Sequence, residues 1–462
     1  MRNIFKNTFK KVTIVSMAVT VALASASASA KVSDQDAAKL EKELTPFGAV
    51  RAANKDGSIP AWTGGITSAP AGYTVGDHHI DPFAEDKALY TITAKNLAEY
   101  KNLLTPGQVK LFETYPDTYK MSIYKSRRSA SYPEHVYQAT LENATKTELV
   151  EGGNGIIEAA IGIPFPVPKN GLEAIWNHIL RYRGEKIVRE GGQAAPTASG
   201  DYTYMGFDDQ LLIPYGVKGV KASELQETNI LFKFKQKVTE PARLAGTALL
   251  VHETMDQIKT PRQAWTYNTG QRRVRRAPNV AYDAPGTASD GLRTTDDFDM
   301  FNGAPNRYNW TLKGKQELLI PYNDYRLHSD DLKYDQILQP GHINPELVRY
   351  EKHRVWVVEA NLKSDTRHTY KKRVFYIDED SWQVAVTDIY DNRDELYRVG
   401  VAHGINYYEV PTQWSTLEVF HDLQSRRYIA MGLDNEANMY DFSADLQDVD
   451  FTSSALRREG RR

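Results

Sequence analysis

Three stretches in the C-terminal part of the chain decide the fold: HRVWVVEANL at residues 353–362, TYKKRVFYID at 369–378 and WQVAVTDIYD at 382–391. In each of them apolar and polar residues nearly alternate, which is the period of a β-strand. Short polar clusters separate the stretches, as they do in an antiparallel meander. We therefore expect neighbouring antiparallel strands in this region.

The same period extends over residues 201–462, which we predict to form one antiparallel β-meander. It recurs in YTYMGF, ILFKFKQKV, GTALLVHETM, AWTYN, RRVRR, NRYNWTLKG, LYRVGVAHGINYYEV and STLEVFHDL. The chain also has 27 Tyr, 15 Phe and 7 Trp, which favour strands and concave surfaces. Because an aromatic sheet face must be covered, we predict a mainly β (α+β) fold: a large curved antiparallel sheet forming an open or half β-barrel, with helices packed on its concave face.

We predict that residues 31–200 form an irregular and helical N-terminal part that packs on the sheet. The clearest helix runs from Asn170 to Gly184. Asn170 is the expected N-cap, Glu173 stands where its side chain can bind back to the Asn170 backbone, and Gly184 ends the helix. No linker or repeat marks a strong boundary. We therefore expect residues 31–462 to form one continuous domain.

Three apolar residues near this helix are candidates for lining a ligand cavity. Trp176 and Ile179 lie on its apolar stripe, and Phe165 belongs to the extended segment IGIPFPVP that precedes it. An amphipathic helix normally buries such a stripe in the core. If that core contains a lipid-sized cavity, the same residues can be both core residues and ligand-binding residues.

The first thirty residues have the features of a signal peptide. MRNIFKNTFKK is basic, VTIVSMAVTVALA is a short apolar run, and Ala28-Ser29-Ala30 is a cleavage-site pattern. We expect cleavage after about Ala30 and release of an exported chain. The sequence contains no cysteine, which excludes disulfides, thiolate metal sites, a cysteine nucleophile and a lipid anchor on cysteine.

The formal net charge is −2, with acidic and basic residues mixed along the chain. A chain of this kind has no overall field that attracts nucleic acid, so nucleic acid is excluded as an expected partner. Any basic site must be local. The oligomeric state is left open.

One local basic site stands in the stretch AWTYNTGQRRVRRAP at residues 264–278. Strand alternation puts its first and last arginines on one face with Val274, and the middle two on the other. We expect one pair to be solvated and the other to lie toward the covered side, paired with an internal carboxylate or with a ligand phosphate or carboxylate. The candidate ligand-binding residues here are Trp265, Tyr267, Arg272, Arg273, Arg275 and Arg276.

Carboxylates concentrate in two further places, Asp296/Asp297/Asp299 and Asp378/Glu379/Asp380. The first set could supply an acid/base pair for a secreted hydrolase. We interpret the second set as solvated charges of a hairpin turn. The chain has no HExxH, no GxSxG and no complete calcium loop, so we expect no metal, no cofactor and no catalytic residue.

Five blocks resemble the DUF1329 family of exported Gram-negative proteins: LTPFGAVRAANKDGSIPAWTGG (44–65), NGIIEAAIGIPFPVPKNGLEAIWNHILRYRG (154–184), AWTYNTGQRRVRRAPNVAYDAP (264–285), DDFDMFNGAPNRYNW (296–310) and SSALRREGRR (453–462). The strand–turn–strand YIDEDSWQVAVTDIYD (376–391) is similar to a hairpin of the LolA/LolB-like lipoprotein-carrier fold, an open antiparallel barrel closed by helices. The blocks span the expected mature chain almost end to end.

The resemblance implies a periplasmic, non-enzymatic protein that holds a hydrophobic molecule. It also implies an RND-type inner-membrane transporter and an outer-membrane protein as partners. Our leading interpretation is a periplasmic carrier of a lipid or other hydrophobic ligand, with the arginines at the mouth of its groove. A structural adaptor of a transport complex without its own ligand, and a secreted hydrolase using Asp296, Asp297 or Asp299, are the alternatives.

Overall fold

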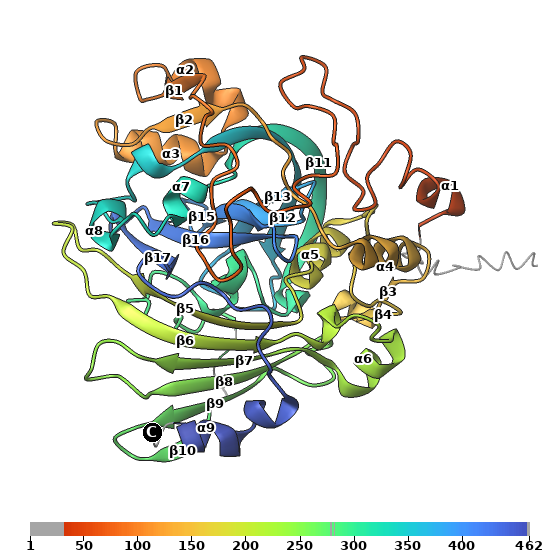
Figure 1. Ribbon diagram of the computed structural model, residues 1–462, viewed down its shortest axis with the longest axis vertical. Coiled ribbons are helices and arrows are strands. Elements are labelled where there is room, and N and C mark those ends of the chain that lie inside the picture. The colour runs from red at the N-terminus through yellow and green to blue at the C-terminus, as the bar shows by residue number, and fades with distance from the viewer. Residues whose placement is uncertain (1–31, 278–279, 281, 460–462) are drawn as a thin grey trace, which may run out of the picture.

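The computed structural model describes residues 32–277, 280 and 282–459. A 15-stranded sheet built largely from two antiparallel meanders dominates it (Figure 1). The first meander consists of β12 (Tyr350–Leu362), β13 (Lys372–Asp378), β14 (Val384–Tyr390), β15 (Leu396–Tyr407), β16 (Thr412–Asp422) and β17 (Arg427–Leu433). The second consists of β5 (Lys186–Ala194), β6 (Met205–Leu212), β7 (Ile230–Val238), β8 (Ala248–Thr254), β9 (Gln263–Asn268) and β10 (Arg273–Arg276).

Strands β17 and β5 join the two meanders by antiparallel pairing, with Ala430 opposite Ala194. At the other side of the first meander, β12 pairs antiparallel with β11 (Tyr308–Pro321) and parallel with β2 (Met121–Tyr124), which pairs with β1 (Tyr90–Ile92). A separate small sheet contains β3 (Glu148–Leu149) and β4 (Ile156–Ile157).

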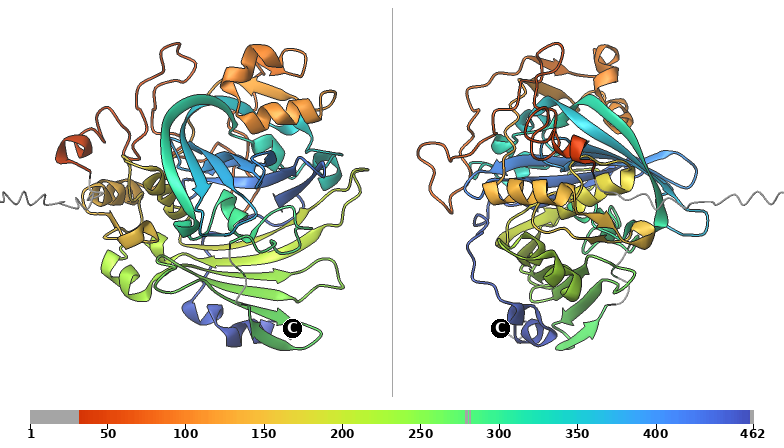
Figure 2. Two further views of the ribbon diagram at one scale, coloured as in Figure 1. Left: turned by 180° about the vertical axis from the view of Figure 1, so that it is seen from behind. Right: turned by 90° about the vertical axis from the view of Figure 1, so that its right-hand side faces the viewer.

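The sheet is curved and open, as predicted. Its strand order begins at β1 and ends at β10 without closing, and β11 arches around one end of it (Figure 2). The β2–β12 contact makes the sheet mixed rather than purely antiparallel. Because strands from both halves of the chain belong to this one sheet, we propose that residues 31–462 form a single domain.

Helices cover both faces of the sheet. The longer ones are α3 (Pro106–Thr114), α4 (Glu134–Ala144), α5 (Gly171–Leu180), α6 (Ala222–Thr228) and α9 (Ser453–Glu459). The single-turn ones are α1 (Asp34–Ala37), α2 (Leu97–Tyr100), α7 (Tyr325–His328) and α8 (Tyr334–Ile337). Helix α5 packs on β11 and β12 in the concave core, whereas α3 packs on β14 and β15 from the opposite side and α9 covers β8, β9 and β10. None of the helices in the described part of the chain is long and apolar enough to cross a membrane.

Helix α5 begins where its sequence predicts and ends earlier. The Asn170 side-chain oxygen accepts the Glu173 backbone N–H at 2.9 Å, which satisfies an otherwise unpaired donor of the first turn. The helix stops at Leu180 because Arg181 has an extended backbone. Phe165, Trp176 and Ile179 are all buried in the large core on the concave side.

The hairpin turn between β13 and β14 corrects one expectation. Asp378, Glu379 and Asp380 do form the turn, but they are buried rather than solvated. The N-terminal irregular segment folds over them: the Val50 N–H donates to Glu379, and Arg128 holds Asp380 through two bonds of 2.9 and 2.7 Å. Arg128 also donates to the carbonyls of that segment, so its guanidinium fastens the segment to the turn.

Replacing Arg128 by Met should therefore destabilise the protein strongly. The change leaves Asp380 buried without its partner, which typically costs ~3–5 kcal/mol of unfolding free energy. The neighbouring ion pair of Arg127 with Asp86 is the matched control, since Arg127 is about one-third exposed and its replacement by Met should cost ~1 kcal/mol or less. Urea unfolding of both variants checks the difference, and equal losses would contradict this role of Arg128.

Candidate functional site

A strap of chain, residues 282–302, crosses the concave side of the sheet. It includes the short helical turn η4 (Thr295–Met300). Two small cavities lie beneath it, each bounded by strap residues and by strands of the second meander. The two cavities adjoin, because Gln236, Arg293 and Phe298 line both of them.

The first cavity is apolar and has a volume of about 130 Å³. Alternate residues of β7 and β8 point into it, as the two-residue period of a strand requires. At its rim Arg262 binds Glu253 at 2.6 Å, so this buried charge is paired. The apolar lining residues are Phe232, Phe234, Leu249, Val251, Val280 and Phe298.

The second cavity, which we call the polar cavity because charged residues line it, has a volume of about 90 Å³. It lies between the strap and strands β5, β6, β16 and β17. Arg189 and Asp209 face it as an ion pair of 3.0 Å, and Trp414 and Glu418 face it from β16. An apolar cavity and a cavity lined by charged residues thus lie side by side, with Gln236, Arg293 and Phe298 between them.

Arg293 projects from the strap to the junction of the cavities. Its side chain is buried, with 9% of the residue exposed, and burial lowers its pKa. Within the described chain it forms no ion pair, its Nε has no hydrogen-bond partner, and its Nη1 donates only to the Thr294 carbonyl at 3.3 Å. A buried guanidinium without a carboxylate is exceptional, since desolvating an unpaired charge is costly.

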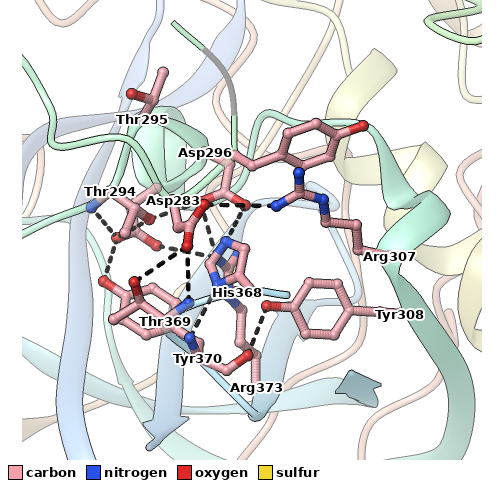
Figure 3. Close-up of polar contacts among 12 residues, drawn as sticks. Asp283, Thr294, Thr295, Asp296, Arg307, Tyr308, His368, Thr369, Tyr370 and Arg373 are labelled. Carbon is pink, nitrogen blue, oxygen red and sulfur yellow. Dashed lines mark hydrogen bonds and ion pairs between the residues drawn. The ribbon is translucent and has the colours of Figure 1, made fainter. Parts of the chain in front are cut away.

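The strap is anchored along one side by carboxylates. Figure 3 shows Asp296 between His368 and Arg373, at 3.1 and 2.8 Å, with Asp283 accepting from the Thr369 backbone N–H at 3.1 Å. Burial alone would raise the pKa of Asp296, but the charge of Arg373 and the bond from His368 hold it below its usual range. The next carboxylate, Asp297, accepts the Tyr370 hydroxyl at 2.8 Å.

Asp299 anchors the strap to the end of helix α5. Its carboxylate binds Arg181 and Arg183 and also accepts the Trp414 indole N–H at 3.0 Å. Its backbone carbonyl accepts from Nε2 of His178 at 2.8 Å, because Nδ1 of that ring accepts the Val384 N–H. Burial lowers the pKa of His178 to about 3, so this ring is neutral. The Asp296, Asp297 and Asp299 carboxylates are thus bound by protein groups.

Glu418 is a second charged group without an ion-pair partner in the described part of the chain. It accepts only the Ser415 hydroxyl, at 2.8 Å. Burial, followed by the repulsion of Asp299, raises the pKa of Glu418 from 4.5 to about 7. Protonation of this carboxyl near neutral pH removes a negative charge from the polar cavity.

Replacing Glu418 by Gln should stabilise the protein at high pH and not at low pH. Between pH 4.5 and 7 the folded chain retains a proton that the unfolded chain has lost, so stability falls as pH rises through this range. The neutral amide removes that penalty, a gain on the order of 1–3 kcal/mol at pH 8. Urea unfolding at pH 4.5 and pH 8 measures it, with exposed Glu227→Gln as the control; an equal effect at both pH values would contradict the assignment.

One group of described residues has the spacing of metal ligands: atoms of His353, Asp378 and Asp380 lie within 4.8 Å of one another. Protein groups already bind two of these three side chains, Asp380 and His353. Arg128 binds both oxygens of Asp380, and His353 lies 3.0 Å from Glu351, an arrangement that raises the pKa of His353 despite its burial. Oδ1 of Asp378 is buried and has no hydrogen-bond partner among the described residues, and burial raises the pKa of this carboxyl to about 6.

The expectation that one arginine pair lies on the covered side is wrong. Arg272, Arg273, Arg275 and Arg276 are all exposed, and only Val274 between them is partly buried. The reason is that β10 is the last strand of the sheet, so no further strand covers its outer edge. Charged side chains on such an edge hinder pairing with another chain. A ligand-binding role for these arginines stays a prediction.

The aromatic candidates lie away from both cavities. Tyr267 is buried and Trp265 partly buried in the cluster under the C-terminal helix α9, on the opposite face of the sheet. Phe165, Trp176 and Ile179 fill the core, and neither cavity is lined by them. The junction is lined by Gln236, Arg293 and Phe298. These residues belong to no recognisable sequence motif, so the sequence alone did not identify them.

Comparison with known proteins places the chain in a family. The model of a protein family of unknown function, DUF1329, matches residues 91–457. The chain belongs to the DUF1329 family. An uncharacterized protein of Pseudomonas aeruginosa is 52% identical over 432 residues, covering 93% of this chain and 94% of the relative. The family predicted from the sequence blocks is therefore confirmed.

Several solved structures are similar to this DUF1329 chain. A putative outer membrane lipoprotein-sorting protein domain from Vibrio parahaemolyticus has a TM-score of 0.44 at 15% identity, covering 62% of this chain and 98% of that one. A DUF1329 protein from Desulfovibrio piger has 0.41 at 14%, covering 59% and 92%. A LolA superfamily protein from Nitrosomonas europaea has 0.36 at 15%, covering 62% and 99%.

Proposed function

We propose that this DUF1329 protein is a periplasmic carrier that binds a hydrophobic ligand between the strap and strands β5–β8. The observation that carries the proposal is the apolar cavity beneath the strap, which adjoins a cavity lined by charged residues. Burying an acyl chain contributes ~0.8 kcal/mol per CH₂, so an apolar groove of this kind can take up a chain that water rejects.

The strap must move to admit such a ligand. Cavities of about 130 and 90 Å³ are smaller than the ~300–1,000 Å³ of typical ligand sites. The outer part of the strap, residues 286–291, is held to the sheet by hydrogen bonds rather than by buried ion pairs: Gln193 donates to the carbonyls of Thr287 and Ala288, and Arg398 donates to the Gly291 carbonyl. Arg427 also binds Asp290 at the surface. The inner part is fixed by buried carboxylates, so we infer that the outer part lifts about them.

Export and partners belong to the same proposal. The basic and apolar pattern of residues 1–30 supports a signal peptide cleaved after about Ala30, and the absence of cysteine argues against a lipid anchor at the new N-terminus. An RND-type inner-membrane transporter and an outer-membrane protein are the partners that we propose. They would load or receive the ligand when the strap is raised.

The contacts of the strap carboxylates support a non-enzymatic role. Asp299 and Glu418 share the polar cavity and have pKa values displaced in opposite directions, a pattern that acid/base pairs also show. Asp299, however, is fully engaged by two guanidinium groups and an indole. A carboxylate held in this way is a poor nucleophile or base, so a hydrolase is disfavoured.

The proposal predicts that fixing the strap abolishes ligand uptake. The chain has no cysteine, so the double variant Gln193→Cys/Ala288→Cys can be joined specifically by a short bis-methanethiosulfonate crosslinker. Uptake of a fluorescent fatty acid should be lost in the crosslinked protein and return when dithiothreitol cleaves the link. The same molecule before and after cleavage is the control, and unchanged uptake in the crosslinked state would contradict a moving strap.

A further inference from the structure

Arg293 differs from every other arginine that lines the two cavities. Arg189 is paired with Asp209 at 3.0 Å, and Arg262 is paired with Glu253 at 2.6 Å. Arg293 alone among these has no carboxylate partner in the described chain. The residues outside the description, 1–31, 278–279, 281 and 460–462, contain no Asp or Glu that could supply one.

A glycine of the strap makes room for this guanidinium. Gly286 lies directly against it: a Cβ added there would stand 2.7 Å from Cζ of Arg293, closer than side-chain atoms pack. The Gly286 N–H also donates to the Arg293 carbonyl at 3.1 Å, so the two residues face each other across a tight loop. The guanidinium is therefore seated in a defined position rather than extended into solvent.

We propose that Arg293 binds the carboxylate of an aliphatic monocarboxylic acid whose hydrocarbon chain enters the apolar cavity. This inference rests on the proposed carrier function and names the class of its ligand. A guanidinium presents parallel N–H donors that match a carboxylate. Phe298, beside Arg293 on the strap and shared by both cavities, stands where the head group would meet the chain.

The charges around the polar cavity favour a single carboxylate. Arg293 forms no ion pair in the described chain, and its charge is only partly offset by the attraction of Asp297 and Glu418 beyond ion-pair distance. One ligand carboxylate can pair with this guanidinium, whereas Glu418 on the same cavity, which also lacks an ion-pair partner in the described chain, would repel a second one.

Calorimetric titration of the full chain with decanoic acid, decanol and methyl decanoate tests the inference. At pH 7.5 the acid is ionised, and the three molecules share one chain length. The acid should bind at least roughly tenfold more tightly than either neutral molecule, as expected for a charge-assisted hydrogen bond. Equal binding of all three would overturn the carboxylate site and leave the carrier function standing; binding of none would overturn both.

Two variants locate the site. Arg293→Gln should lower the affinity for decanoic acid roughly tenfold to hundredfold, to the level of decanol, without changing decanol binding. It should fold normally, because it removes an unpaired buried charge. Arg243→Gln, at an exposed arginine that lines neither cavity, is the matched control and should keep the wild-type preference. Loss of the acid preference in the control, or its persistence in Arg293→Gln, would overturn the assignment to Arg293.

Discussion

The carboxylate of Asp299, held between Arg181 and Arg183, is the interaction on which the concave side of the protein depends. It ties the strap to the end of helix α5, which is itself packed on β11 and β12. Asp299 and the next residue, Met300, have backbone φ angles of 53° and 65°, a left-handed conformation that non-glycine residues adopt at some cost. The buried ion pairs maintain this turn, and the turn directs Phe298 toward the cavities.

Charges on this side of the sheet fall into two classes. Asp296 and Asp299 are fully paired, and they fix the inner part of the strap. Arg293 and Glu418 are buried without ion-pair partners in the described chain, and both face the polar cavity. Leaving a buried charge without its partner is costly for stability. An amphiphilic ligand would supply the missing partner of Arg293 and fill the neighbouring apolar cavity.

Local patterns in the sequence predicted much of the fold. Period-two alternation placed β7 and β12, and Asn170 marked the start of α5. Strand β5 was missed because its glycines and charges interrupt the alternation, and its pairing with β17 joins segments more than two hundred residues apart. The buried turn at Asp378–Asp380 could not be foreseen either, since its cover comes from a distant irregular segment. Arg293 stands in a loop of small and polar residues that forms no recognisable motif.

Native mass spectrometry of the protein purified from the periplasm of its own cells, with extraction of bound molecules, tests the ligand beneath the strap most directly. We predict one amphiphilic carboxylic acid per chain, released when the protein is unfolded. A chain that carries only its polypeptide mass, with an extract free of any amphiphile, would contradict a carrier role for this cavity.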